Sequence, residues 1–217
     1  MKLKFIGFNE NHLSELVRIH RISFKDHFNS RLGSSYAKAF IRWFGTSNEY
    51  DNIFICAVDG ETEQLVGYIC GARDGYSTSM NKKLMRLIIF SFLLRPWLIF
   101  DRRFYELFGP KLKSILGRSE YPDFNEFEQK LPQPIFSVTS FALEPEYRNA
   151  GFGIFLLERL FAEFFKRMDE KKAGTIRATI RSSNKNIFKY YKSNKWLVAP
   201  YDKNSKTIRF YKEMKGN

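Results

Sequence analysis

The segment from Phe141 to Ile154 reads Phe-Ala-Leu-Glu-Pro-Glu-Tyr-Arg-Asn-Ala-Gly-Phe-Gly-Ile, and the interpretation of the whole chain starts from it. The run 135–143 is apolar and predicts a strand, which Glu144 and Pro145 close. The run 151–168 carries apolar residues at helical spacing and predicts an amphipathic helix. A loop containing glycines therefore joins a strand to the first turn of a helix.

Such a junction is a favourable place for a phosphate group. The first turn of a helix has unpaired backbone N–H groups and the positive end of the macrodipole. Gly151 and Gly153 remove side chains that would keep a phosphate away, and Arg148 can add a charge-assisted hydrogen bond. The lysine ending of a P-loop is missing, and a Rossmann fingerprint does not fit the position in the chain. The residues alone therefore indicate a phosphate site of another class, or a simple turn.

The context of this loop is more specific, because the pattern from Leu143 to Ile154 resembles the acetyl-coenzyme A signature of the GNAT superfamily of N-acetyltransferases, Val-x-Pro-x-Tyr-Arg/Gln-x-x-Gly-x-Gly/Ala. A second segment is similar to the family's Asn-x-x-Ala-x-x-x-Tyr-x-x-x-Gly-Phe pattern, with Ile187 in place of the alanine and Lys195 in place of the glycine. The resemblance implies an α/β fold of the α+β type, the GNAT fold. This fold has a mixed, largely antiparallel sheet flanked by helices and splayed at its central parallel strand pair.

The resemblance also implies roles for individual residues. Backbone groups at the end of the strand are expected to pair with the pantetheine arm, and one strand N–H to polarise the thioester carbonyl. Backbone N–H groups of the loop are expected to hold the pyrophosphate. The implied cofactor-binding residues are Phe141, Ala142, Leu143, Arg148, Asn149, Ala150, Gly151, Phe152, Gly153, Ile154 and Asn184. Tyr191 is implied as the catalytic general acid that protonates the leaving thiolate. Simple packing of Tyr191, with Tyr190 exposed, is an equal alternative.

The general base is not evident from the sequence. Some family members place a carboxylate on the strand before the phosphate loop, and the run 136–140 contains none. Asp26, His27, Asp123 and Glu128 are candidates in segments expected to border the acceptor cleft, although each is more ordinarily a loop or surface residue. Direct attack of the amine with a water relay is an equal alternative, and no metal is expected.

Hydrophobic periodicity predicts the other elements of a single domain that spans residues 1–217. Strands are expected at 2–7, 53–59, 64–72, 175–180, 196–200 and 207–212, and helices at 12–24, 34–44 and 184–193. A polar loop is expected at 26–33.

The stretch 75–133 lies outside the family's common pattern and is predicted to be a helical insertion. Two helices split near Pro96, a third helix at 102–116 and an ordered acidic loop at 121–133 are expected. The insertion is apolar and basic, so 82–118 suits a peripheral membrane surface or a lipid-linked substrate. A helical lid whose apolar face packs on the domain is the simpler reading. No uncharged run in it is long enough to cross a membrane.

Composition limits the remaining choices. The 217 residues carry a net charge of +13, which suits anionic partners and equally an ordinary solvated surface. Nucleic-acid binding is not expected, because no recognition motif accompanies the charge. Cys56 and Cys70 lack metal-type spacing and are predicted to be buried free thiols. Together with a polar N-terminal stretch, they predict a cytoplasmic protein.

The sequence therefore predicts an enzyme, an N-acetyltransferase that moves an acetyl group from acetyl-coenzyme A to a primary amine of a small molecule. An amino sugar, nucleotide-linked or lipid-linked, ranks first as acceptor. The reason is that the insertion and the segment 28–36 loosely resemble GNAT proteins of surface-polysaccharide assembly. The alternatives are a non-catalytic relative that binds acyl-coenzyme A, and a protein or peptide N-acetyltransferase.

Overall fold

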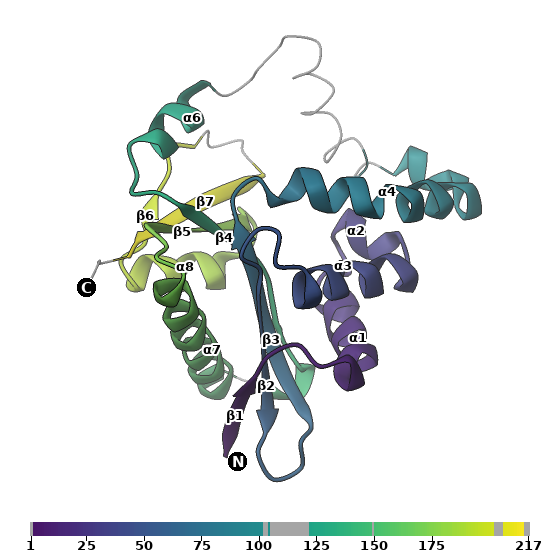
Figure 1. The fold of residues 1–217 in the computed structure, drawn as a ribbon, viewed down its shortest axis with the longest axis horizontal. Helices are drawn as coiled ribbons and strands as arrows, with labels where there is room; N and C mark the ends of the chain where they lie inside the picture. Colours follow the sequence, from purple (N-terminus) through teal and green to yellow (C-terminus); the bar gives the residue numbers. More distant parts are fainter. Residues whose placement is uncertain (1, 102–103, 105–121, 149, 202–205, 215–217) are drawn as a thin grey trace.

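The computed structural model describes residues 2–101, 104, 122–148, 150–201 and 206–214. Their centre is a seven-stranded sheet with the strand order β1-β2-β3-β4-β5-β7-β6 (Figure 1). The strands are β1 Leu3–Ile6, β2 Ile53–Asp59, β3 Leu65–Arg73, β4 Ile135–Leu143, β5 Thr175–Arg181, β6 Leu197–Val198 and β7 Thr207–Glu213. Every neighbouring pair is antiparallel except β4 and β5, which are parallel. The predicted mixed, largely antiparallel sheet is confirmed.

Helices cover both faces of this sheet (Figure 1). They are η1 Glu10–His12, α1 Leu13–Ser23, α2 Phe28–Arg31, α3 Ser34–Thr46, α4 Tyr76–Leu94, η2 Pro96–Phe100, α6 Pro122–Gln129, η3 Pro145–Tyr147, α7 Ala150–Glu170 and α8 Lys185–Ser193. One apolar core lies between the sheet and helices α1, α3 and α4, and a second lies between the sheet and helices α7 and α8. Strand β2 shows why both form. Its residues alternate in direction, so Phe54 and Cys56 enter the first core while Ile53 and Ile55 enter the second.

The two parallel strands in the centre, β4 and β5, separate along their length. They pair only where Ile135–Val138 of β4 lies beside Thr175–Ala178 of β5. Beyond that point β4 continues along β3 and β5 continues along β7. A bulge marks the place, since Cys70 lies opposite Ser140 and the next residue, Gly71, lies opposite Val138. Because a bulge adds twist to its strand, this local irregularity favours the separation. The expected splay of the sheet is confirmed.

Three expected elements differ from the structure. The polar loop at 26–33 contains the short helix α2, and the second helix of the insertion is only the 3-10 segment η2. The predicted acidic loop at 121–133 is wrong, because α6 occupies most of it. Phe127 of α6 packs edge-on against the ring of Tyr211, so a contact distant in sequence stabilises this helix. The helix predicted at 102–116 lies outside the described residues, apart from Phe104.

Two further expectations concern the cysteines and the membrane. Cys56 and Cys70 are buried free thiols, as predicted, and burial raises the pKa of the Cys56 thiol to about 12. Among the described helices, none combines the length and the apolar character that crossing a bilayer requires.

Candidate active site at the parted strands

The end of β4 is held by contacts from the sheet and from α1. The backbone N–H of Glu144 donates to the carbonyl of Val66 at 2.8 Å, which is the last contact with β3. The guanidinium of Arg18 on α1 then grips both carboxylate oxygens of Glu144, at 2.8 and 2.5 Å. A bidentate pair of this kind fixes orientation as well as distance. The chain therefore leaves the sheet at a defined point before it turns into α7.

Arg148 folds back onto the loop that precedes α7. Its Nε and Nη2 donate to the carbonyl oxygen of Leu143 at 2.9 and 2.7 Å, and Nη2 also donates to the hydroxyl of Ser23 at 2.7 Å. Its Nη1 has no partner among the described residues. A contact from Arg148 to a pyrophosphate stays a prediction.

The two glycines of the loop stand in different surroundings. A Cβ atom at Gly153 would lie 3.1 Å from the carbonyl oxygen of Tyr147, so Gly153 permits the close packing of α7 on its own loop. A Cβ atom at Gly151 would meet no atom within 4 Å. Packing therefore explains Gly153, whereas at Gly151 the structure leaves an open space beside the first turn of the helix. That a phosphate occupies this space stays a prediction.

The first turn of α7 is accessible. Because α7 begins at Ala150, the N–H groups of its first four residues have no partner within the helix. Phe152, Ile154 and Phe155 point outward and are 41%, 54% and 49% exposed. The side chains of this turn thus leave its backbone donors uncovered. Asn149 lies outside the described residues.

The free edge of β4 presents alternate backbone groups. A Cβ atom on Gly67 would lie 2.7 Å from the carbonyl oxygen of Ala142, so that carbonyl points toward β3. Because hydrogen-bonding groups alternate along a strand, those of Phe141 and Leu143 point toward the side that β5 has left. The carbonyl of Leu143 is taken by Arg148. The N–H groups of Phe141 and Leu143 are therefore the donors placed to meet a ligand between the strands.

Tyr191 of α8 is fully buried in the second core, between the sheet and helices α7 and α8. Its ring lies 6.0 Å from Phe161, 4.6 Å from Trp196 and 5.0 Å from Phe210, between ring centroids. Phe161 also contacts Phe141 at 5.5 Å, so a single ring separates Tyr191 from β4. The Tyr191 hydroxyl has no hydrogen-bond partner among the described residues, and burial raises its pKa far above the ordinary value. A buried hydroxyl without a protein partner needs an explanation, such as an ordered water or a bound ligand.

The second matched segment keeps its local geometry despite two substitutions. Asn184 accepts a hydrogen bond from the N–H of Ile187 at 3.3 Å and caps α8, so its role toward a cofactor stays a prediction. Lys195 has φ +58°, which is the left-handed conformation that the family's glycine adopts easily. A lysine there costs about 1 kcal/mol, and the turn nevertheless forms. Ile187 packs half-buried against the second core.

A buried hydrogen-bonded chain crosses from α1 to β4. The Nδ1 of His20 lies 2.6 Å from the hydroxyl of Tyr68, which lies 2.7 Å from the hydroxyl of Ser140. Burial, with a smaller effect of His27, lowers the pKa of His20 to about 4, so His20 is neutral at pH 7. The sequence carried no signal for a contact among His20, Tyr68 and Ser140. Their meeting depends on the register of β3 and β4.

This neutral histidine makes the stability of the protein depend on pH. In the unfolded chain His20 becomes protonated below about pH 6.5. In the folded chain it becomes protonated only below about pH 4. We therefore expect His20 to reduce the free energy of unfolding as the pH falls through this window, with a limiting slope of about 1.4 kcal/mol per pH unit. Urea unfolding of the wild type and of His20→Gln at pH 7, 6 and 5 isolates the effect. Equal slopes for both proteins would mean that His20 is not held neutral.

Of the four proposed bases, Glu128 is the most engaged. Its Oε1 accepts hydrogen bonds from Arg177 at 2.9 Å, Arg209 at 3.0 Å and the Tyr211 hydroxyl at 2.5 Å. Arg177 also donates to Asp74 at 2.5 Å. An oxygen that already accepts three hydrogen bonds is poorly placed to take a proton from an amine. Through these contacts Glu128 connects α6 to β5 and β7.

Removing this carboxylate should destabilise the protein. Glu128→Ala leaves Arg177, whose side chain is only 15% exposed, with Asp74 as its one remaining carboxylate partner among the described residues. We expect a loss of about 3 kcal/mol in the free energy of unfolding, because an incompletely paired buried charge is costly. Urea unfolding measures it, with Glu126→Ala on the same helix as an exposed control. A loss no larger than the control's would show that the cluster does not form.

The end of α1 and the residues that follow it make contacts near the ends of both separated strands, β4 and β5. Ser23 contacts Arg148 at the end of β4, and the carbonyl of Asp26 accepts a hydrogen bond from Arg181 at the end of β5, at 2.8 Å. The side chains of Asp26 and His27 are exposed. That these two side chains border the acceptor cleft stays a prediction, and the side chain of Asp123 lies outside the described part of the chain.

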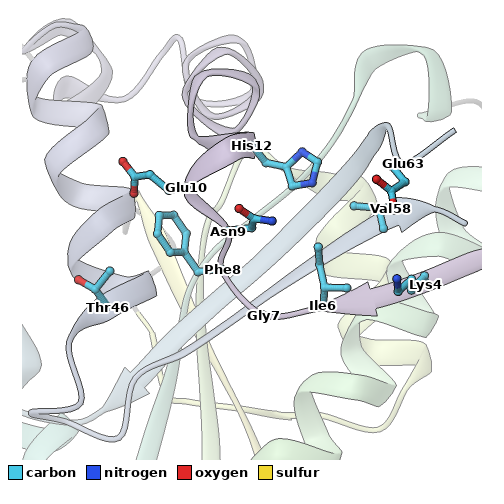
Figure 2. Close-up of a pocket in the computed structure, with 10 residues that line it drawn as sticks. All are labelled: Lys4, Ile6, Gly7, Phe8, Asn9, Glu10, His12, Thr46, Val58 and Glu63. Atoms are coloured by element: carbon cyan, nitrogen blue, oxygen red, sulfur yellow. The ribbon is translucent and has the colours of Figure 1, made fainter.

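A separate pocket of about 620 Å³ lies at the junction of β1 and α1 (Figure 2). It is lined by Lys4, Ile6, Gly7, Phe8, Asn9, Glu10, His12, Thr46, Val58 and Glu63. None of the predicted site residues lies in it. Asn9 caps η1 there, and Glu10 is paired with Arg42. These two polar side chains of the pocket therefore already have local structural roles.

Known proteins show where this fold occurs. No protein-family model matches the sequence, and no curated protein matches it either. Among solved structures, PaiA N-acetyltransferase from Thermoplasma acidophilum in complex with coenzyme A is 15% identical, with a TM-score of 0.53 over 99% of this chain and all of that one. A GNAT-family acetyltransferase from Staphylococcus aureus Mu50 is 12% identical, with a TM-score of 0.56 and coverage of 99% and 100%.

A third similar structure is NAA60 from Arabidopsis thaliana in complex with a bisubstrate analogue. It is 14% identical, with a TM-score of 0.56, and both chains are covered completely. At these identities the likeness concerns the fold. The sheet and helices of the described residues form the GNAT fold.

Proposed function

We propose that this protein is an N-acetyltransferase that moves an acetyl group from acetyl-coenzyme A to a primary amine. The observation that carries the proposal is the separation of β4 from β5 directly before a loop in which Gly151 leaves an open space. We propose that the extended arm of the donor lies between the strands and that its pyrophosphate lies at the helix start. The coenzyme A bound to PaiA, a protein of the same fold, supports this donor.

The donor would be held mainly by backbone groups. We assign the pyrophosphate to the N–H groups of the first turn of α7 and the pantetheine arm to the edge of β4 at Phe141 and Leu143. Arg148 and Asn184 would add side-chain contacts. This distribution suits a common cofactor, since backbone groups are held by the fold and need little reorganisation.

The reaction would proceed by direct transfer. The neutral amine nitrogen bonds to the thioester carbonyl carbon, and the carbon–sulfur bond breaks. The nitrogen releases a proton to water, and the departing thiolate takes up a proton from water. A strand N–H at Phe141 or Leu143 would polarise the carbonyl. The Tyr191 hydroxyl has a pKa well above the roughly 8.5 of a thiol. Tyr191 would therefore stabilise the departing thiolate by donating a hydrogen bond to it, and a full proton transfer from the free protein's tyrosine would be uphill.

For the acceptor we propose a small-molecule amine, with an amino sugar first. The start of the helical insertion lies beside β4 and β5, because Tyr76 of α4 is close enough to Thr139 and Arg177 for both to influence its pKa. This position supports a role for the insertion in shaping the acceptor site. The engagement of Glu128 in an ion cluster favours one alternative, a non-catalytic relative that binds acyl-coenzyme A. The bisubstrate analogue bound to NAA60 keeps a peptide acceptor as the other. The two buried free thiols support a cytoplasmic location.

The direct test combines binding and turnover. Calorimetry with coenzyme A should show one site per chain, and thiol release from acetyl-coenzyme A should increase with an amine from a panel of amino sugars, amino acids and short peptides. Binding without thiol release for any amine would favour the non-catalytic alternative. No binding of coenzyme A would overturn the proposal.

A further inference from the structure

The far end of α4 and the adjoining η2 carry a group of large apolar side chains that face solvent. We call this group the apolar tip, and its members are Ile89, Phe90, Leu93, Leu94, Trp97 and Phe100. Leu93 is 74% exposed, Trp97 63% and Phe100 82%. In Figure 1 this end of α4 projects past α2 and α3. Scattered single apolar residues are common on protein surfaces, whereas six neighbours indicate an interaction site.

The opposite side of the same segment is anchored to the domain. Met80 and Leu84 of α4 and Leu98 of η2 are buried in the first core. The Ser91 hydroxyl donates to the carbonyl of Leu32 at 2.8 Å, and Arg31 pairs with Asp101 at 2.8 Å. The predicted packing of an apolar face on the domain therefore describes only one side of this segment. The apolar tip lies on the other side and faces solvent.

A positive charge adjoins the apolar tip along the helix. One stripe of α4 changes from cationic to apolar along the helix. Its residues lie three or four positions apart and are Lys82, Arg86, Ile89 and Leu93. Lys82 and Arg86 have no carboxylate partner among the described residues, whereas Lys83 is paired with Glu49 at 3.0 Å. The chain as a whole carries a net charge of +13. The partner of this surface should thus offer both an apolar medium and negative charge.

We propose that the apolar tip inserts into the interface of an anionic lipid bilayer, with Lys82 and Arg86 at the level of the headgroups. From Arg86 to Leu93 the helix rises about 10 Å, which matches the roughly 5–10 Å depth of interfacial insertion. Tryptophan favours this boundary region. Each cation near an anionic surface adds about 1 kcal/mol. The inference does not rest on the proposed acetyltransfer.

A second copy of this chain fits the same surface less well. If two α4 helices paired in parallel, Lys82 and Arg86 of one copy would face the same cations of the other. If they paired antiparallel, these cations would lie against Leu93 of the partner copy and lose water without gaining a counter-charge. A bilayer accepts the apolar end and the cationic part at different depths, so it meets both requirements together.

The three tryptophans of the chain make a direct test possible. Trp43 and Trp196 are buried, at 6% and 5% exposed, so a change in fluorescence on binding reports mainly on Trp97. With vesicles of phosphatidylglycerol and phosphatidylcholine we expect a blue shift of the emission and sedimentation of the protein with the vesicles. Vesicles of phosphatidylcholine alone should bind at least tenfold more weakly. Trp97→Phe should keep the binding and lose the shift.

Matched variants connect the binding with the surface. Phe90→Glu combined with Leu93→Glu should lower vesicle binding at least tenfold, while Leu197→Glu, at a leucine on β6 that is 48% exposed, should not. Lys82→Glu combined with Arg86→Glu should remove the preference for anionic lipid. Unfolding midpoints check that each variant is folded.

Three results would overturn the proposal. The first is a wild-type protein that does not sediment with anionic vesicles at low salt. The second is a folded Phe90→Glu/Leu93→Glu variant that sediments as the wild type does. The third is a dimer, measured by light scattering, that this variant converts to a monomer without any change in lipid binding. All three leave binding of coenzyme A unaffected, so they are separable from a failure of the proposed function.

Discussion

Gly151→Glu is expected to weaken the binding of coenzyme A by at least about 100-fold and to leave the protein folded. No atom lies within 4 Å of the Cβ position at Gly151, so the new side chain meets no protein atom at its base. It would instead occupy the proposed phosphate space and bring a negative charge to the N–H groups of the first turn of α7. Loss of several charge-assisted hydrogen bonds, each worth about 1.5–3 kcal/mol, accounts for the magnitude.

The measurements are calorimetry with coenzyme A and thermal unfolding in its absence. Gly7→Glu is the matched control, because a Cβ atom there also meets nothing within 4 Å and Gly7 lies in the separate pocket of Figure 2. Gly153 is a poorer test position. A Cβ atom there would press on the backbone of the loop, so lost binding and lost packing would be confounded. If Gly151→Glu binds coenzyme A as tightly as Gly7→Glu does, the assignment of the phosphate site is wrong.

Tyr191→Phe is expected to reduce kcat by about 10²-fold, at the lower end of the range for removing one hydrogen-bond donor to a developing negative charge. The free energy of unfolding should stay the same or rise by about 1 kcal/mol, because the change removes a buried hydroxyl that has no protein partner. This combination is diagnostic. A purely packing tyrosine would lose nothing in catalysis, and a tyrosine with a structural hydrogen bond would lose stability.

Steady-state thiol release and urea unfolding provide the two readings, once an amine acceptor has been found. Tyr211→Phe is a useful contrast, because its hydroxyl donates to Glu128 at 2.5 Å and its removal should cost stability. Tyr190→Phe tests the neighbouring ring, which is half-buried. Unchanged turnover in Tyr191→Phe would leave packing as the role of this residue, which is the alternative that the sequence pattern left open.

Much of the donor side was predictable because it depends on local chain geometry. A strand, two glycines and the start of a helix are consecutive in the sequence, and the backbone groups that they expose follow from the element types alone. The splay of the sheet was expected from the family resemblance and is confirmed by the short pairing of β4 with β5. The roles of Tyr191 and Asn184 toward the donor stay predictions.

The acceptor side was less predictable, because its character depends on residues that meet from distant parts of the chain. Glu128 was a candidate base until α6 brought it against Arg177, Arg209 and Tyr211. The chain from His20 through Tyr68 to Ser140 joins three elements whose register no local pattern reveals. The apolar run of α4 was visible in the sequence. Which of its faces would be covered depended on where α2 and α3 lie.

The sequence by itself determined the strand, the glycine loop and the helix that point to an acetyl-coenzyme A site, because each is specified by neighbours along the chain. Only the tertiary structure decided that Gly151 faces open space while Gly153 serves packing, and that Arg148 closes on Leu143. The physical reason is the same for each. Whether a side chain, or its absence, serves a ligand or the fold depends on what lies opposite it in space, and the sequence order does not contain that neighbour.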